Sequence, residues 1–198
     1  WLNIKSIEFP SKVKIIEKRA FFNCHGLETV FFSENSELSL ICERAFQRTG
    51  IKTFIIPSNV ERIEGNWLGS NQLEEIAISS GNKNIRYLDE EHKILIEKSD
   101  PKSSEFDVLL FVYQNVENLF IPSFVKYIES YVFNLGSCIK TIEFDENSKL
   151  VVIGEGSFSF SRIECISIPS STQIIEKYAF FECARLKKVQ IPNDSKLI

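Results

Sequence analysis

Six glutamates fall on short stretches in which apolar and polar residues alternate, and a pair of carboxylates is what most glycoside hydrolases use to cleave a sugar bond. These glutamates are Glu8, Glu74, Glu75, Glu117, Glu143 and Glu164. Carboxylates at such positions more often lie in water on the outer face of a strand. A carbohydrate-active enzyme therefore stays as one alternative, and the stretches that carry these glutamates have to be placed first.

The histidines and glycines add no catalytic arrangement. His25 and His92 lie far apart in the sequence, and the acidic triplet 89–91 before His92 is better explained as a solvated loop than as a metal site. The segment Gly154–Gly156 lacks the third glycine of a dinucleotide-binding loop, so it predicts a turn. We expect no catalytic residue, no metal ligand and no cofactor, and therefore a protein that is not an enzyme.

The cysteines do not form a recognisable pattern either. There are five, an odd number, and no C-x-x-C pair or histidine at ligand spacing accompanies them. We interpret them as small buried apolar side chains, and they do not indicate a redox compartment. They are Cys24, Cys42, Cys138, Cys165 and Cys183.

Composition and charge exclude two kinds of partner. The 198 residues are 43% hydrophobic, which is enough for a core, and the formal net charge is −4. A chain without a basic patch is not expected to bind nucleic acid. The longest apolar run, Val108–Tyr113, is far shorter than the roughly 20 residues of a membrane helix, so this segment is not expected to insert into a membrane.

A repeated segment organises the chain. The decapeptides Ile15–Cys24 and Ile174–Cys183 are identical at eight of ten positions. Aligning them brings the remaining sequence into units of the form L-x-x-I-x-[IF]-P-x-x-V-x-x-I-x-x-x-A-F, a period that is typical of stacked repeats. About eight turns are predicted, and they begin at Ile4, Leu27, Ile51, Leu73, Val116, Ile139, Ile163 and Leu186.

Each unit predicts one short β-strand and one tight turn. Apolar residues recur three and five positions after each start, which is typical of a strand with one buried face. Proline follows five of the strands and is expected to end them. Further along the unit, a small residue beside an aromatic one, as in Ala20 and Phe21, predicts a short helical turn whose ring stacks on that of the next unit.

The repeat itself is duplicated. The isoleucines at 16, 41 and 63 recur at 128, 153 and 175, a constant shift of 112 residues. The hexapeptide SENSEL at 33–38 meets DENSKL at 145–150 with the same shift, and in both places an Asn-Ser loop replaces the proline turn. This relation favours an older internal duplication.

Residues 79–115 interrupt the repeat. Two apolar runs, Ile94–Ile96 and Val108–Tyr113, flank a polar loop that contains Pro101. Such a pattern predicts a β-hairpin, and we expect it to project from the stack as an insertion.

With the pattern Ile-Pro-Ser-x-Val-x-x-Ile-x-x-x-Ala-Phe-x-x-Cys in place, the chain resembles the BspA-like leucine-rich repeats, most clearly at Phe9–Cys24 and Ile168–Cys183. The resemblance extends over residues 4–198 apart from the hairpin, with Trp67-Leu68 for Ala-Phe and Thr172 for valine as departures in packing volume. It implies a single right-handed solenoid over residues 1–198, mainly parallel β with one main sheet on its concave side and an incomplete last turn. It also implies a cell-surface or extracellular location. The composition, rich in Lys, Asn, Ile, Ser and Phe, is similar to that of the protozoan members of the family.

The strand alternation predicts which side chains leave the core. The residue between the two buried positions must point outward. In order along the chain, these residues are Glu8, Phe31, Ile55, Ala77, Phe120, Glu143, Ser167 and Gln190. The second to fifth are apolar, and we expect them to merge into one binding patch flanked by Glu8 and Glu143. The alternative is that the hairpin folds over this patch and buries it.

These expectations favour a non-enzymatic recognition module that binds a protein or glycan on another cell or in the matrix. Two alternatives stay open, an intracellular scaffold that uses the same surface and a solenoid carbohydrate-active enzyme. The chain begins without a polar cap and stops within a repeat, so we also expect it to self-associate through its ends. The sequon at Asn193–Ser195 carries little weight for secretion.

Overall fold

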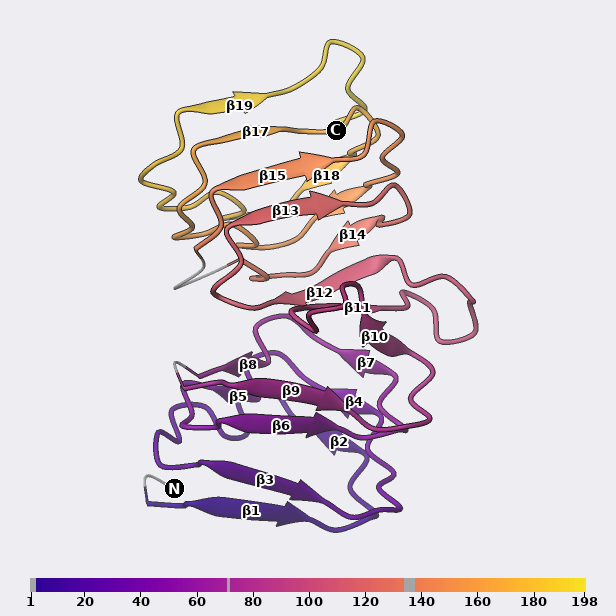
Figure 1. Cartoon of the computed structure of the whole chain (residues 1–198), viewed down its shortest axis with the longest axis vertical. Helices are drawn as coiled ribbons and strands as arrows, with labels where there is room; N and C mark the ends of the chain where they lie inside the picture. Colours follow the sequence, from indigo (N-terminus) through magenta and orange to yellow (C-terminus); the bar gives the residue numbers. More distant parts are fainter. Residues whose placement is uncertain (1–2, 71, 134–137) are drawn as a thin grey trace. The chain divides into compact units, whose positions relative to one another are not determined.

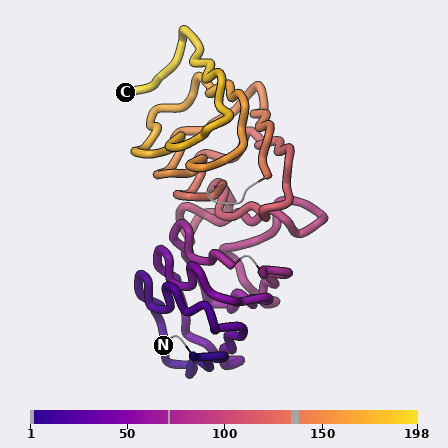
Figure 2. Tube along the Cα trace, turned by 90° about the vertical axis from the view of Figure 1, so that its left-hand side faces the viewer, coloured from indigo at the N-terminus to yellow at the C-terminus, as the bar shows by residue number. Residues whose placement is uncertain are grey.

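The chain forms two compact units, Trp1–Arg86 and Tyr87–Ile198. The computed structural model describes residues 3–70, 72–133 and 138–198. Within these residues every regular element is a β-strand, and each unit is built from successive coils of the chain (Figures 1 and 2). The described part of the chain therefore contains no helix that could cross a membrane.

The first unit is organised by four strands that run in the same direction (Figure 1). They are β1 (Ser6–Phe9), β3 (Thr29–Phe32), β6 (Thr53–Ile56) and β9 (Glu75–Ile78). β1 pairs with β3 and β6 pairs with β9, both in parallel, while β3 lies beside β6. Val30, Phe54 and Ile76 point inward and are buried, which confirms the predicted alternation.

Shorter ladders close the coils of this unit. β2 (Ile15–Ile16), β4 (Leu40–Ile41) and β7 (Arg62–Ile63) pair in parallel, and their second residues are buried opposite the longer strands. β5 (Phe46–Gln47) pairs with β8 (Leu68–Gly69) in a third ladder. Each of the first three coils thus contributes strands to at least two parallel ladders, as expected for a solenoid.

The second unit repeats this plan. Its longer strands are β13 (Asn118–Ile121), β15 (Thr141–Phe144), β17 (Cys165–Ser167) and β19 (Lys188–Gln190). The short ladder contains β14 (Tyr127–Ile128), β16 (Val152–Ile153) and β18 (Ile174–Ile175). Strands β1, β2, β3 and β4 recur as β13, β14, β15 and β16 with the shift of 112 that the sequence predicted.

The predicted hairpin is confirmed, but its placement differs from the prediction. β10 (Ile85–Tyr87) leads from one unit to the other, and β11 (Ile94–Glu97) pairs antiparallel with β12 (Val108–Val112). β12 also pairs in parallel with β14, so the hairpin extends the short-strand ladder of the second unit instead of projecting from it. Its apolar residues are buried there, which explains why both runs are continuous rather than alternating.

The proline turns behave as predicted. In each of them the residue three positions after the proline donates its backbone N–H to the proline carbonyl, which closes a reverse turn. The prolines are Pro10, Pro57, Pro122, Pro169 and Pro192. Since proline cannot donate to a ladder, it ends each strand at the same place.

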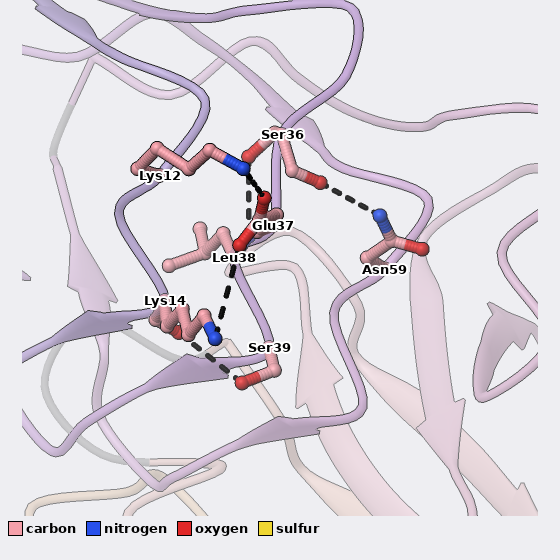
Figure 3. A network of polar contacts seen from close by, with 7 residues as sticks. All are labelled: Lys12, Lys14, Ser36, Glu37, Leu38, Ser39 and Asn59. Carbon is pink, nitrogen blue, oxygen red and sulfur yellow. Dashed lines mark hydrogen bonds and ion pairs between the residues drawn. The ribbon is translucent and has the colours of Figure 1, made fainter.

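The Asn-Ser loop that replaces one of these turns is tied to both neighbouring coils (Figure 3). The Glu37 carboxylate forms ion pairs with Lys12 and Lys14 of the preceding coil. On the other side, Asn59 Nδ2 donates to the backbone oxygen of Ser36 at 2.7 Å. The loop is thus part of the stack.

The same loop recurs in the second unit. The Glu37 N–H donates to the Ser11 carbonyl at 2.7 Å, and the Lys149 N–H donates to the Ser123 carbonyl at 3.1 Å. Both residues of the second bond lie 112 positions after those of the first. The duplication therefore preserves individual hydrogen bonds as well as sequence.

Aromatic rings stack from coil to coil in the core, as predicted. The rings of Phe21 and Phe46 are parallel with centroids 5.3 Å apart. In the second unit Phe158 stacks on Phe133 at 4.8 Å and on Phe180 at 5.1 Å. Stacked rings add to the stabilisation from apolar burial, so these columns connect successive coils.

The turns around these rings are not the short helices that the sequence suggested. Ala20 N–H donates to Glu17, Phe22 N–H to Arg19 and Cys24 N–H to Phe21, which makes three consecutive reverse turns. Arg19 and Asn23 have φ values of 60° and 63°, which no right-handed helix contains. The small residue beside the aromatic residue allows close packing within a turn. The spacing of the two residues is also compatible with a helical turn, so the sequence does not distinguish the two structures.

Candidate functional site

The outward residues of the first unit form the candidate site. Strand register places Glu8 directly opposite Phe31, and Ile55 directly opposite Ala77. Because β3 and β6 are neighbours, Phe31 and Ile55 lie on adjacent strands of the same outer surface. We call Phe31, Ile55 and Ala77 the apolar strand face.

The apolar strand face is open to solvent. Phe31 and Ile55 are each 55% exposed, and Ala77 is half-buried between its neighbours. Glu8 and Glu75 are exposed on β1 and β9, the strands that pair with β3 and β6. A group of apolar side chains beside charged ones is typical of an interaction surface.

Phe120 and Glu143 belong to the second unit, where the register pairs them directly. Phe120 is 54% exposed, so the hairpin of its own unit does not bury it. Beyond them the surface is polar, with Ser167 Oγ donating to Gln190 Oε1 at 2.7 Å. The structure thus confirms that both predicted residues point outward, while their merger with Phe31, Ile55 and Ala77 into one patch stays a prediction.

Two of the six glutamates, Glu117 and Glu164, each pair with a lysine of the next coil. Glu117 Oε2 lies 2.8 Å from Lys140 Nζ, and Glu164 Oε2 lies 3.0 Å from Lys187 Nζ. The hydrogen bond from Lys187 lowers the pKa of Glu164 below its ordinary value. A glycosidase needs one carboxyl group with a raised pKa as its general acid, so this environment is opposite to the one that the reaction requires.

The His92 and Asp89 side chains that the sequence singled out make local structural contacts. The His92 ring stacks on Tyr87 with centroids 4.0 Å apart, and the Asp89 carboxylate accepts N–H bonds from Lys93 and Ile94. Among the described residues no group of three or more His, Cys, Asp or Glu side chains is placed to hold a metal ion. The segment Gly154–Gly156 forms the predicted turn, in which Ser157 N–H donates to Gly154 O.

The cysteines are free thiols in different surroundings. Cys24 and Cys42 are buried as predicted, and burial raises the pKa of the Cys42 thiol. Cys183 Sγ donates to the Phe158 carbonyl at 3.0 Å. The prediction is wrong for Cys165, which is exposed because Ile166 takes the inward position of β17.

A second exposed apolar group was missed from the sequence. Tyr178 is 61% exposed, and its ring meets that of Phe181 edge to face at 5.8 Å. Phe160 of the preceding coil meets Phe181 at 5.5 Å. The sequence does contain one indication of this exposure. Arg19 occupies the position of Tyr178 in the other decapeptide, and a position that varies between repeats is expected to lie at the surface.

Comparison with known proteins identifies relatives of this architecture. The family model described as the BspA type leucine rich repeat region matches six copies over residues 1–89 and 105–198. No curated protein matches the chain. The family match leaves out residues 90–104, which contain β11 and most of the hairpin loop, and includes both sets of coils.

Solved structures share the fold. The pneumococcal vaccine antigen PcpA superposes with a TM-score of 0.81 at 27% identity over 98% of this chain and 47% of its own. A leucine-rich repeat protein from Eubacterium ventriosum gives a TM-score of 0.72 at 21% identity over 98% of this chain and 55% of its own. A leucine rich cell surface protein from Faecalibacterium prausnitzii gives 0.65 at 20% identity over 96% of this chain and 60% of its own. The chain thus spans about half the length of these proteins.

Proposed function

The chain belongs to the BspA type leucine rich repeat family, and from that premise we propose that it is a non-enzymatic recognition module of a cell-surface or secreted protein. Its partner is a protein or glycan of another cell or of the matrix. The module contacts this partner through the outward side chains of its longer strands. No cofactor takes part in this function.

One observation carries the proposal. Phe31 and Ile55 are each 55% exposed although they lie on neighbouring strands whose inward residues are buried. Covering both side chains would release ordered water and stabilise a complex by about 1–2 kcal/mol per residue. Glu8 and Glu75 at the outer strands would set the orientation of the partner, since charged rims contribute more to specificity than to affinity.

The relatives support the location. One of the similar structures is a vaccine antigen and another is a cell surface protein. An intracellular scaffold would use the same strand face, and detection with an antibody on intact, unpermeabilised cells separates the two. Staining only after permeabilisation would favour the scaffold.

A solenoid carbohydrate-active enzyme is the less favoured alternative, because Glu117 and Glu164 each pair with a lysine. A hydrolysis screen over polysaccharides tests it, with Glu143→Gln as the control variant. Hydrolysis that Glu143→Gln abolishes would overturn the recognition proposal.

The proposal as a whole is tested by adding the labelled protein to intact cells and to extracellular-matrix preparations. We expect saturable binding that unlabelled protein displaces. Binding that stays linear with concentration, on every surface tried, would contradict a recognition role.

A further inference from the structure

Residues with a left-handed backbone recur at fixed places in the turns that follow the short strands β2, β4 and β7 and their counterparts in the second unit. We call this side of each unit its turn edge. In the turn from Glu17 to Ala20, the Ala20 N–H donates to the Glu17 carbonyl and Arg19 occupies the third position with φ 60°. A turn with φ above zero at its third position favours glycine. The Arg19 N–H meanwhile donates to Glu43 of the next coil at 3.1 Å, so the stacking of coils fixes this backbone shape.

Glycine nevertheless occupies only one of the places that the two units share. Arg19, Arg44, Asn66 and Arg48 of the first unit have φ values of 59–60°. The residues 112 positions later are Tyr131, Gly156, Tyr178 and Phe160, with φ values of 56–63°. Each bulky residue costs about 1–2 kcal/mol in this conformation, and such strained positions are concentrated at functional sites.

The two units differ in what they carry at these places. The first unit presents three arginines and one asparagine, and the second presents aromatic side chains and one glycine. Since the backbone is the same, it does not determine which side chains these places carry. The turn edge of the first unit is therefore chemically distinct.

Two of the three arginines converge on one ring. The guanidinium carbons of Arg19 and Arg48 each lie 5.8 Å from the centroid of the half-buried Phe22 ring. Arg19 and Arg48 come from neighbouring coils, and both side chains are exposed. The ring holds the two cations near each other by cation–π attraction and needs no carboxylate to do so.

Neither of these guanidinium groups forms an ion pair within the described parts of the chain. The nearby Glu43 carboxylate is already shared by Lys18 and by Arg44, whose Nε lies 3.0 Å from Glu43 Oε1. Lysines elsewhere in the first unit, such as Lys5 and Lys12, pair with glutamates of the next coil. Arg19 and Arg48 are thus two cations with free hydrogen-bond donors.

We propose that Arg19, Phe22 and Arg48 form a binding site for a carboxylate, and that the carboxylate belongs to an isolated Asp or Glu of a partner protein. The planar fork of an arginine matches both oxygens of a carboxylate. Phe22 provides an apolar surface for the methylene groups of the Asp or Glu side chain that carries the carboxylate. The site lies on the turn edge and is separate from the apolar strand face.

The surroundings favour a single carboxylate over a polyanion. Glu17 lies in the coil of Arg19 and Glu64 lies in the coil that follows that of Arg48, and both would repel a dense array of negative charge. The sequence carries a net charge of −4, so long-range attraction does not assist. A heparin-like or uronate polymer would need a row of unpaired cations, whereas this site supplies two.

The test is a titration of the whole 198-residue chain with the peptide acetyl-Ala-Glu-Ala-amide, followed by NMR through the arginine Nε–Hε signals. We expect saturable shifts at Arg19 and Arg48 and none with the matched peptide acetyl-Ala-Gln-Ala-amide. Arg19→Gly and Arg48→Gly should each weaken the affinity by about fivefold, the scale of an exposed ion pair. Glycine suits the left-handed backbone, so loss of binding in these variants does not arise from unfolding.

Two control variants separate the site from general effects. Tyr178→Gly makes the same backbone change in the other unit and should leave the affinity unchanged. Lys12→Gln removes one positive charge elsewhere in the first unit and should change it less than twofold. Equal weakening by Lys12→Gln and Arg19→Gly, or an absence of saturable shifts, would overturn the site. Heparin or hyaluronate binding that is tighter than the peptide and lost in Arg19→Gly would overturn the assignment to a protein partner.

Discussion

Arg19 and Tyr178 occupy the same position of two nearly identical decapeptides, and both have a φ of 60°. The second position at which the decapeptides differ holds Asn23 and Glu182, with φ values of 63° and 53°. The differences thus fall on left-handed turn residues, of which Arg19, Tyr178 and Glu182 are exposed and Asn23 is half-buried. The repeated letters include the ladder residues and the core aromatics, so the fold constrains them in every coil.

Glycine at position 19 should be tolerated better than a β-branched residue. Arg19→Gly relieves a strained backbone at the cost of a more flexible unfolded chain, so we expect a free energy of unfolding within about 1 kcal/mol of the native value. Arg19→Val keeps the strain and adds crowding at Cβ, and should lose about 1–2 kcal/mol. Urea denaturation measures both. Equal stability of the two variants would contradict the left-handed turn.

The stacked phenylalanines should dominate the stability of their unit. Phe46 is fully buried between Phe21 and Phe54, so Phe46→Ala should lower the free energy of unfolding by about 3–5 kcal/mol. Phe31→Ala removes an exposed ring of the same size and should cost less than about 1 kcal/mol. Thermal and urea unfolding of the two variants provide the comparison. A similar loss in both would mean that Phe46 does not lie in the core.

Gly154 should not accept a side chain. A Cβ at this position would lie 2.6 Å from Ile128 O and 2.9 Å from Ser130 N, both backbone atoms of the preceding coil. Gly154→Ala should therefore destabilise the protein by about 2–3 kcal/mol. At Gly69 the nearest atom is Gln47 Cγ at 3.2 Å, which belongs to a flexible side chain, so Gly69→Ala should be milder. The reverse order of the two effects would contradict the coil spacing.

Ion pairs between coils predict a loss of stability in acid. The hydrogen bond from Lys12 lowers the pKa of Glu37 below its ordinary value of 4.5, so this pair stabilises the folded state above that pH. The contribution is lost as the pH falls through the lower pKa of the folded state. The same bond raises the pKa of Lys12 above 10.5, so the contribution also fades as the pH rises through that raised value.

Glu37→Gln tests this pair. The variant should be less stable than the native protein at pH 7, and the difference should shrink as the pH falls below 4.5 and through the lowered pKa of Glu37, because a protonated carboxyl is neutral like the amide that replaces it. Urea denaturation over a pH series measures the difference. A constant difference at all pH values would show that the charge of Glu37 does not contribute.

Much of the fold was predictable because stacking repeats one set of constraints. Ile16, Ile41 and Ile63 are buried one above another, and each coil needs an apolar residue at that place. The proline turns and the shift of 112 follow from the same requirement. Sequence spacing alone did not distinguish three consecutive turns from a helical one, because residues such as Arg19 and Tyr178 do not favour a left-handed backbone.

The placement of the hairpin was not predictable from local pattern. Both of its apolar runs are continuous, which fits strands buried on both faces. The parallel partner of β12 is β14, which lies more than ten residues further along the chain, so the local pattern does not reveal it. The outward residues could be predicted because strand alternation has a period of two. Cys165 departs from the prediction because residue type alone favours a buried cysteine, whereas its outward place on β17 exposes it.

The apolar strand face is tested most directly by measuring the affinity of the labelled protein for the cells or matrix that bind it. Phe31→Ser and Ile55→Ser should each weaken binding at least tenfold, the equivalent of about 1.4 kcal/mol. Ile15→Ser is the matched control, since Ile15 is a similarly exposed apolar residue on a short strand of the same unit, and it should leave the affinity unchanged. Native affinity in Phe31→Ser and Ile55→Ser, with the fold intact, would contradict recognition through this face.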